Sequence, residues 1–188
     1  MPSATVTVIV VGLLLVAAWY LSFSAGRLDR LHARVEGARA ALDAQLVRRA
    51  SVSLQLATSG FLDPATSLLV AGAAHEAREA APEDREVAES DLTRALHAAF
   101  DEPGLPDALD AEPAGHELVV ELASACQRVE LARRFLNDAV RGARVVRRKR
   151  VVRLLRLAGH APWPSTFEMD DAPPAVLVAR SGGPTVVP

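Results

Sequence analysis

The sequence predicts an all-α protein in which an N-terminal transmembrane helix continues into an antiparallel four-helix bundle with long first and last helices. Three observations lead to this prediction. An uncharged apolar run opens the chain, good helix formers such as Ala, Leu and Arg dominate the remaining residues, and apolar residues recur there at helical spacing rather than in alternation. About 165 residues come after the apolar run, which is enough for one domain with its own core.

The apolar run from Val6 to Phe23 contains no charged residue. As a helix that rises ~1.5 Å per residue it covers about 27 Å, and over residues 4–25 it covers about 33 Å, against a hydrocarbon core of ~30 Å. Trp19 and Tyr20 lie near its end, where aromatic rings favour the membrane interface. A cleaved signal peptide is the alternative, but no Lys or Arg precedes the run and the run is long for such a peptide. We therefore predict that residues 1–25 comprise an extracytoplasmic end and a transmembrane helix.

Basic residues flank the run only on its C-terminal side. They are Arg27, Arg30, Arg34, Arg39, Arg48 and Arg49. Because basic residues close to a span stay in the cytoplasm, we expect a single-pass protein of the cell membrane with its N-terminus outside and its C-terminal domain in the cytoplasm. The single cysteine, Cys126, excludes an intramolecular disulfide, which agrees with a reducing compartment.

The first soluble helix is expected to continue directly from the apolar run, because no proline interrupts it before Pro64. Apolar residues in it recur at the alternating three- and four-residue spacing of a coiled-coil seam. They are Leu28, Leu31, Val35, Ala38 and Leu42. The apolar pattern continues to Ala57, and Gly60 is the expected stop.

Two shorter helices are expected next. Asp63 followed by Pro64 predicts an N-cap and a proline in the first turn of a helix over about 64–80. Residues 82–100 predict a third helix, with acids in its first turn, where the helix dipole favours them. Three prolines within residues 101–115 predict a loop.

The fourth helix is expected from residue 116 to about 157, so that the bundle occupies residues 26–158. Its buried stripe is predicted from apolar residues at helical spacing. They are Leu118, Leu122, Ala125, Val129, Ala132, Leu136, Ala139 and Ala143. Residues 159–171 are expected to be extended, and residues 172–188, rich in Pro and Gly, to be disordered.

The order of these features resembles the LemA family, in which a single N-terminal span precedes an antiparallel helical domain that faces the cytoplasm. Residues 128–140 resemble the family's stretch Arg-Ile-x-x-Ala-Arg-x-Tyr-Tyr-Asn-Asp-Ala-Val, with Phe-Leu in place of the two Tyr, as in a divergent member. Residues 44–49 resemble its Val-Gln-Leu-Lys-Arg-Arg run, residues 75–76 its His-Glu pair, and residues 162–167 its Phe-Lys-Pro-x-x-Phe segment. The resemblance implies a fold and a topology rather than an enzymatic activity. It also marks Asn137-Asp138 as a polar pair shared with the family.

The sequence contains no recognisable catalytic, cofactor-binding or metal-binding motif. The five His include no i,i+4 pair that could hold a metal on a helix, and Cys126 falls on the expected inner face of the fourth helix, as a small core residue does. We therefore predict no enzymatic activity, no cofactor and no metal. An enzyme whose site combines His75, Asn137 and Asp138 is an alternative.

The clearest charge feature is a basic run that no acid interrupts. It contains Arg141, Arg144, Arg147, Arg148, Lys149, Arg150, Arg153 and Arg156. In an up-and-down bundle the last helix returns toward the membrane, so residues of about 25–42 and 141–157 should pair as a two-helix stalk near the inner leaflet. Each cation there gains about 1 kcal/mol from anionic lipids. A role in topology alone, and binding of nucleic acid or an acidic partner, are the alternatives, although few aromatic residues accompany the run as in nucleic-acid sites.

The function predicted from these observations is a single-pass, membrane-anchored helical scaffold whose cytoplasmic bundle docks a protein partner. The apolar run, the bundle pattern and the lack of a catalytic motif favour this function. Two alternatives remain: a lipid-contacting, membrane-organising protein that uses residues 141–156 on anionic inner-leaflet lipids, and an uncharacterised enzyme.

Overall fold

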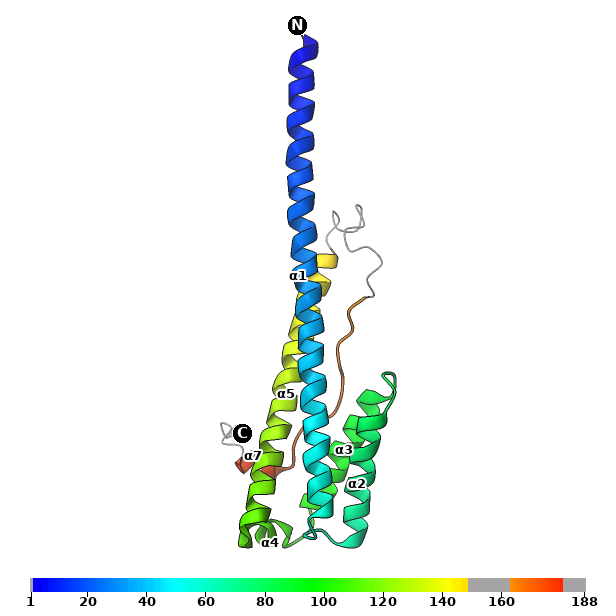
Figure 1. The fold of residues 1–188 in the computed structure, drawn as a ribbon, viewed down its shortest axis with the longest axis vertical. Coiled ribbons are helices and arrows are strands. Elements are labelled where there is room, and N and C mark those ends of the chain that lie inside the picture. Colours follow the sequence, from blue (N-terminus) through cyan, green and yellow to red (C-terminus); the bar gives the residue numbers. More distant parts are fainter. Residues whose placement is uncertain (1, 149–162, 181–188) are drawn as a thin grey trace. The chain divides into compact units, whose positions relative to one another are not determined.

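A computed structural model describes residues 2–148 and 163–180, without the side chains of residues 2–5, 17, 21, 24 and 25. Its helices are α1 (Pro2–Thr58), α2 (Pro64–Glu79), α3 (Arg85–Phe100), α4 (Leu105–Ala111), α5 (Pro113–Arg147) and α7 (Ala175–Arg180), as Figure 1 shows. No strand occurs within these described ranges, so the predicted all-α class is confirmed.

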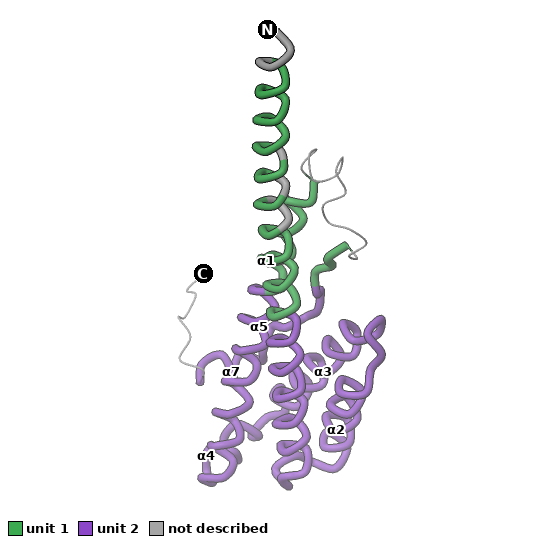
Figure 2. The backbone as a smooth tube through the Cα atoms, turned by 45° about the horizontal axis from the view of Figure 1, so that its top comes forward, with its two compact units in different colours: residues 1–38, 136–166 green, residues 39–135, 167–188 purple. Residues whose placement is uncertain are grey.

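The chain divides into two compact units, coloured separately in Figure 2. Unit 1 combines residues 1–38 with residues 136–166, and unit 2 combines residues 39–135 with residues 167–188. Each unit therefore takes one part of α1 and one part of α5, and the bundle predicted over residues 26–158 is shared between the two units.

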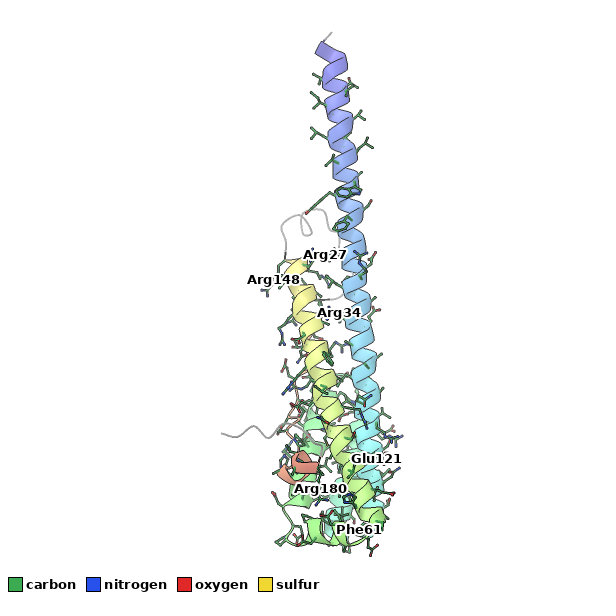
Figure 3. All side chains as sticks on the ribbon, turned by 90° about the vertical axis from the view of Figure 1, so that its left-hand side faces the viewer. Arg27, Arg34, Phe61, Glu121, Arg148 and Arg180 are labelled. Carbon is green, nitrogen blue, oxygen red and sulfur yellow. The ribbon has the colours of Figure 1, made fainter. Side chains whose placement is uncertain are left out.

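Unit 1 pairs the N-terminal part of α1 with the C-terminal part of α5. Leu28 and Val146 pack together, with Leu31 against them. These contacts join the helix segments that were expected to form the stalk. Before Leu28, the large apolar side chains described on α1 are exposed, as the sticks along this helix in Figure 3 illustrate. They are Val6, Val8, Ile9, Val10, Val11, Leu13, Leu14, Leu15, Val16, Trp19, Tyr20 and Phe23.

A membrane span was predicted over residues 4–25. Among the residues that the structure describes, no helix is long and apolar enough to cross a membrane. The predicted span is therefore not confirmed, and residues 4, 5, 17, 21, 24 and 25 within it are among those whose side chains are not described.

Unit 2 is built around one hydrophobic core to which all the described helices contribute. Among its members are Leu56 of α1, Val70 of α2, Leu96 of α3 and Leu122 of α5. The α1 seam continues into unit 2, where Leu42, Leu46 and Ala50 keep the helical spacing of Leu28 and Val35; all five are buried, and Ala50 belongs to this core. Gly60, with φ of 86°, comes after the end of α1, where a left-handed conformation suits glycine.

The local signals at the start of α2 have the predicted effect. The Asp63 carboxylate accepts hydrogen bonds from the backbone N–H groups of Ala65 at 2.9 Å and Thr66 at 3.2 Å, and Pro64 occupies the first turn. Hydrogen bonding by Thr66, with a smaller part from Ala65, lowers the pKa of the Asp63 carboxyl. The cap therefore fixes the position at which the chain turns from α1 into α2.

The loop predicted over residues 101–115 is wrong for much of its length. α4 lies within it, and α5 begins inside it at Pro113. Prolines do not break these helices because they stand in or near the first turn, where the helix lacks a partner for an N–H group. The buried pair Leu105 and Leu109, spaced by one turn, holds α4 on the core of unit 2.

The disordered tail predicted over residues 172–188 is also wrong where it is described. α7 forms at Ala175–Arg180, and Leu177 is completely buried in the core of unit 2. The Pro- and Gly-rich composition predicted disorder, but burial of Leu177 removes a large apolar side chain from water and so stabilises this helix on the core. Residues 163–174 contain neither helix nor strand, and residues 181–188 lie outside the described residues.

Candidate functional site

A buried ionic network joins α1 to α3 in unit 2. Arg49 is 1% exposed and Glu89 is fully buried. The Arg49 guanidinium donates to the Glu89 carboxylate at 2.7 Å, to the Glu89 backbone carbonyl at 2.9 Å and to the Thr93 hydroxyl at 3.0 Å. Arg85 donates to the second oxygen of the same carboxylate at 3.2 Å. Because these bonds are directional, they fix the rotation of α3 about its own axis and so decide which of its faces are left for other contacts.

The first of these faces binds a segment that we call the C-terminal strap, residues 167–180. Four polar side chains of α3, spaced by four, three and four residues, line that face. They are Glu86, Ser90, Thr93 and His97. Glu86 and Ser90 accept from strap N–H groups at 3.0 and 3.1 Å, while Thr93 and the His97 ring contact strap carbonyls at 2.8 Å each. Residues 168–172 of the strap therefore bond to α3 through their backbone, and they form neither a strand nor a helix themselves.

Side chains of the strap hold it at three further points. Asp171 accepts two hydrogen bonds from Arg133 of α5, at 2.6 and 2.9 Å, and this bond to Asp171 raises the pKa of the guanidinium. Arg180, at the end of α7, pairs with Asp110 of α4. These contacts and the buried Leu177 fix the strap in place, and its bonds to Glu86, Ser90, Thr93 and His97 occupy one face of α3.

The second face of α3 forms an open groove with α2, which we call the α2–α3 groove. One hollow of about 470 Å³ is lined by Leu68, Leu69, Gly72, Ala73, Glu76, Asp91, Arg94 and Ala95. A second hollow of about 440 Å³ is lined by Glu76, Glu79, Ala80, Asp84, Val87, Ala88 and Asp91. The two hollows share Glu76 and Asp91, so they adjoin each other along the helix pair.

The basic run predicted as a lipid or partner site is partly engaged within unit 1. Arg141 pairs with Asp138, and Arg144 donates to the carbonyl of Pro164 at 2.8 Å. Arg147 is 8% exposed, and its guanidinium carbon lies 5.0 Å from the centre of the Trp163 ring. Such contacts use Arg144 and Arg147 to hold residues 163–164. Arg148 is exposed, whereas Lys149, Arg150, Arg153 and Arg156 lie outside the described residues.

The other residues singled out from the sequence are divided between the two units. Asn137 is buried, while the side chain of Asp138 is 63% exposed, so the two neighbours face different surroundings. His75 is exposed on α2 in the other unit. Cys126 is 3% exposed, and burial raises the pKa of its thiol, which disfavours the nucleophilic thiolate. Within the described part of the chain, no cluster of three or more His, Cys, Asp or Glu could hold a metal ion.

Two of the arginines interpreted from the sequence as signals of membrane orientation form ion pairs within unit 2. Arg49 belongs to the buried network, and Arg48 pairs with Glu121 on the surface of unit 2. The sequence did not reveal this network because nothing local links Arg49 to a carboxylate forty positions later. Only the arginine pair within residues 44–49, which resembles a family motif, marked the position.

The fold and these surfaces define an all-α protein with an internally bound strap and an open groove on a helix pair. Comparison with models of protein families, with curated proteins and with solved structures found no match.

Proposed function

We propose that this chain is a single-pass membrane protein whose antiparallel helical bundle serves as a docking platform for another protein and has no catalytic activity of its own. The observation that carries the proposal is a change of surface along α1. Its described large apolar side chains are exposed between Val6 and Phe23, and the seam residues Leu28, Val35 and Leu42 are buried.

The exposed segment supports attachment to a membrane. Val8 is 72% exposed, Leu14 64% and Trp19 71%, and the run that contains them has no charge. Leaving such side chains in water costs about 25 cal/mol per Å² of apolar surface, and a contiguous apolar surface beyond a few hundred Å² is typical of a membrane or protein contact. A helix of about 27 Å satisfies its own backbone hydrogen bonds, as a bilayer requires. A bilayer would therefore cover the whole run at once.

The exposed cations next to the run support the orientation. Arg27, Arg30 and Arg34 are exposed on α1 directly after the apolar run, and Figure 3 labels two of them. Positive charge at that end favours a cytoplasmic location for the residues after it. The LemA family, which the sequence resembles, has the same topology, with the helical domain in the cytoplasm.

The docking role is supported by the α2–α3 groove. Both helices that form it are anchored from behind, α2 through Val70 and Ala74 in the core and α3 through the Arg49–Glu89 network. The groove itself is open and partly apolar, as protein-binding surfaces are. We do not favour a lipid-organising role for the basic run, because Arg144 and Arg147 contact residues 163–164 instead.

Fractionation of cells that express the full chain tests this proposal. We expect the protein to remain with the membranes after extraction at alkaline pH. The double variant Val10→Arg/Leu14→Arg should release it, since each cation at mid-span costs about 2.5–3.5 kcal/mol. Val47→Arg is the matched control, because Val47 is an exposed valine of the same helix outside the run. Recovery of the unaltered chain in the soluble fraction would refute membrane attachment.

The docking role has its own test. In-cell crosslinking from positions on α2 and α3 should capture a defined protein that a chain truncated after the apolar run does not capture. The absence of any such protein above that control would remove the docking role and leave the membrane attachment in place.

A further inference from the structure

We propose that the α2–α3 groove binds a cationic amphipathic helix of a partner protein. The inference rests on the proposed docking function and adds the chemistry of the partner. The two hollows of the groove, of about 470 and 440 Å³, adjoin at Glu76 and Asp91, which line both.

The dimensions of the groove suit a helix. α2 and α3 contain 16 residues each, so the groove is about 24 Å long, or roughly four helical turns. Its floor consists of small residues, among them Gly72, Ala73 and Ala88. A side chain added at Gly72 would meet no atom within 4 Å, so the space above this position is open. Small residues at a helix contact allow the axes to approach at the lower end of the usual range of roughly 8–10 Å.

Large apolar side chains lie unburied at both ends of the groove. Leu68 is 76% exposed and Leu69 51% exposed at one end, and Val87 is 62% exposed at the other. The three belong to the lining of the two hollows. A helix whose apolar residues recur every three or four positions would cover both ends from one face. This spacing favours an amphipathic helix over an extended peptide.

The charge of the lining specifies the other face of the partner. Four acids line the groove against a single base, Arg94, and that base already pairs with Asp91. Among the described residues, no ion pair engages Glu76, Glu79 or Asp84. Lys or Arg beside the apolar stripe of the incoming helix would complement these acids. The same acids repel nucleic acid and anionic lipid, so the groove is suited to a protein.

A second copy of this chain is a less suitable occupant. The cations that such a copy could offer lie on its α5. Arg144 of this helix binds the Pro164 carbonyl, and Arg147 lies over the Trp163 ring. Those cations would have to leave their present contacts before they could enter a groove. A different protein with free cations would not have this cost.

Fluorescence anisotropy with a defined probe tests the inference. The probe is a labelled peptide of Leu and Lys, about four helical turns long, with Leu at helical spacing, titrated with the full chain in zwitterionic nanodiscs. We expect saturable binding that weakens at least about tenfold in Gly72→Leu, which fills the groove, and in Glu76→Lys/Glu79→Lys, which reverses its charge. Gly142→Leu should bind as the unaltered chain does, because Gly142 is also an exposed helical glycine with open space around it.

Hydrogen exchange on the same complex locates the peptide, and circular dichroism verifies that each variant is folded. Protection confined to α2 and α3 supports the inference. Equal affinity for Gly72→Leu, protection elsewhere, equal binding of a Leu/Glu peptide, or no binding would overturn it. Self-association that Gly72→Leu abolishes would assign the groove to a second copy and also overturn it. If the peptide does not bind while in-cell crosslinking still captures a partner, this inference fails and the docking function stands.

Discussion

Removing the Glu89 side chain should be one of the most damaging single changes to unit 2. In Glu89→Leu, Arg49 keeps its bonds to the backbone carbonyl of residue 89 and to Thr93 but loses the carboxylate at 2.7 Å. The side chain of Arg49 is 2% exposed, so water cannot replace the lost anion. An unpaired buried charge of this kind costs about 3–5 kcal/mol. Arg85 also loses its partner, but its side chain is 19% exposed and can turn toward solvent.

The double variant Arg49→Met/Glu89→Leu separates an ionic cause from a packing cause. Apolar residues of similar volume often replace a buried ion pair at little cost. We therefore expect the double variant to be more stable than Glu89→Leu alone, by about 2 kcal/mol or more, which would be a large coupling energy. Urea unfolding of the full chain in a neutral detergent, followed by circular dichroism, measures these free energies. A cost below about 1 kcal/mol for Glu89→Leu, or simple additivity in the double variant, would refute the reasoning.

Three further outcomes are expected from the same contacts. Asp171→Asn should weaken the two hydrogen bonds from Arg133 and loosen the strap, which faster hydrogen exchange at the strap amides would reveal, whereas unchanged exchange would contradict the contact. Leu177→Ala should destabilise the docking of α7 by about 2–5 kcal/mol in urea unfolding, while the exposed Val178→Ala should not. Because the folded-state pKa of Asp63 is lowered, its contribution is present above the ordinary pKa of 3.8 and is lost as pH falls through the folded value. Melting curves should therefore show a smaller loss of stability on acidification in Asp63→Asn than in the unaltered chain.

Features that depend on the spacing of residues within one helix could be predicted from the sequence. The buried positions Leu28, Val35 and Leu42 result from one heptad-like seam, and the Asp63 cap results from one dipeptide. The buried stripe on α5 could be predicted in the same way, because apolar residues such as Leu122 occur about once per helical turn. Each of these depends on neighbours within two or three turns of one helix.

Features that depend on residues far apart in the sequence could not be predicted. α4 and α7 are short, and the prolines around them obscure the leucines that hold them on the core, Leu105 and Leu109 in α4 and Leu177 in α7. The basic run was predicted as a lipid or partner contact, and nothing in its spacing indicates that Pro164 and Trp163 contact two of its arginines. The α2–α3 groove was also not predicted from the sequence, because the residues that line it come together only when the two helices pack.

The central claim is that the apolar run crosses the cell membrane with its N-terminus outside. Labelling of intact cells with a membrane-impermeant maleimide tests it most directly, in a Cys126→Ala background that carries either Ser3→Cys or Thr58→Cys. The account predicts that the Ser3→Cys variant is labelled in intact cells and that the Thr58→Cys variant is labelled only after permeabilisation. Labelling of Thr58→Cys in intact cells, or protection of both positions until permeabilisation, would contradict it.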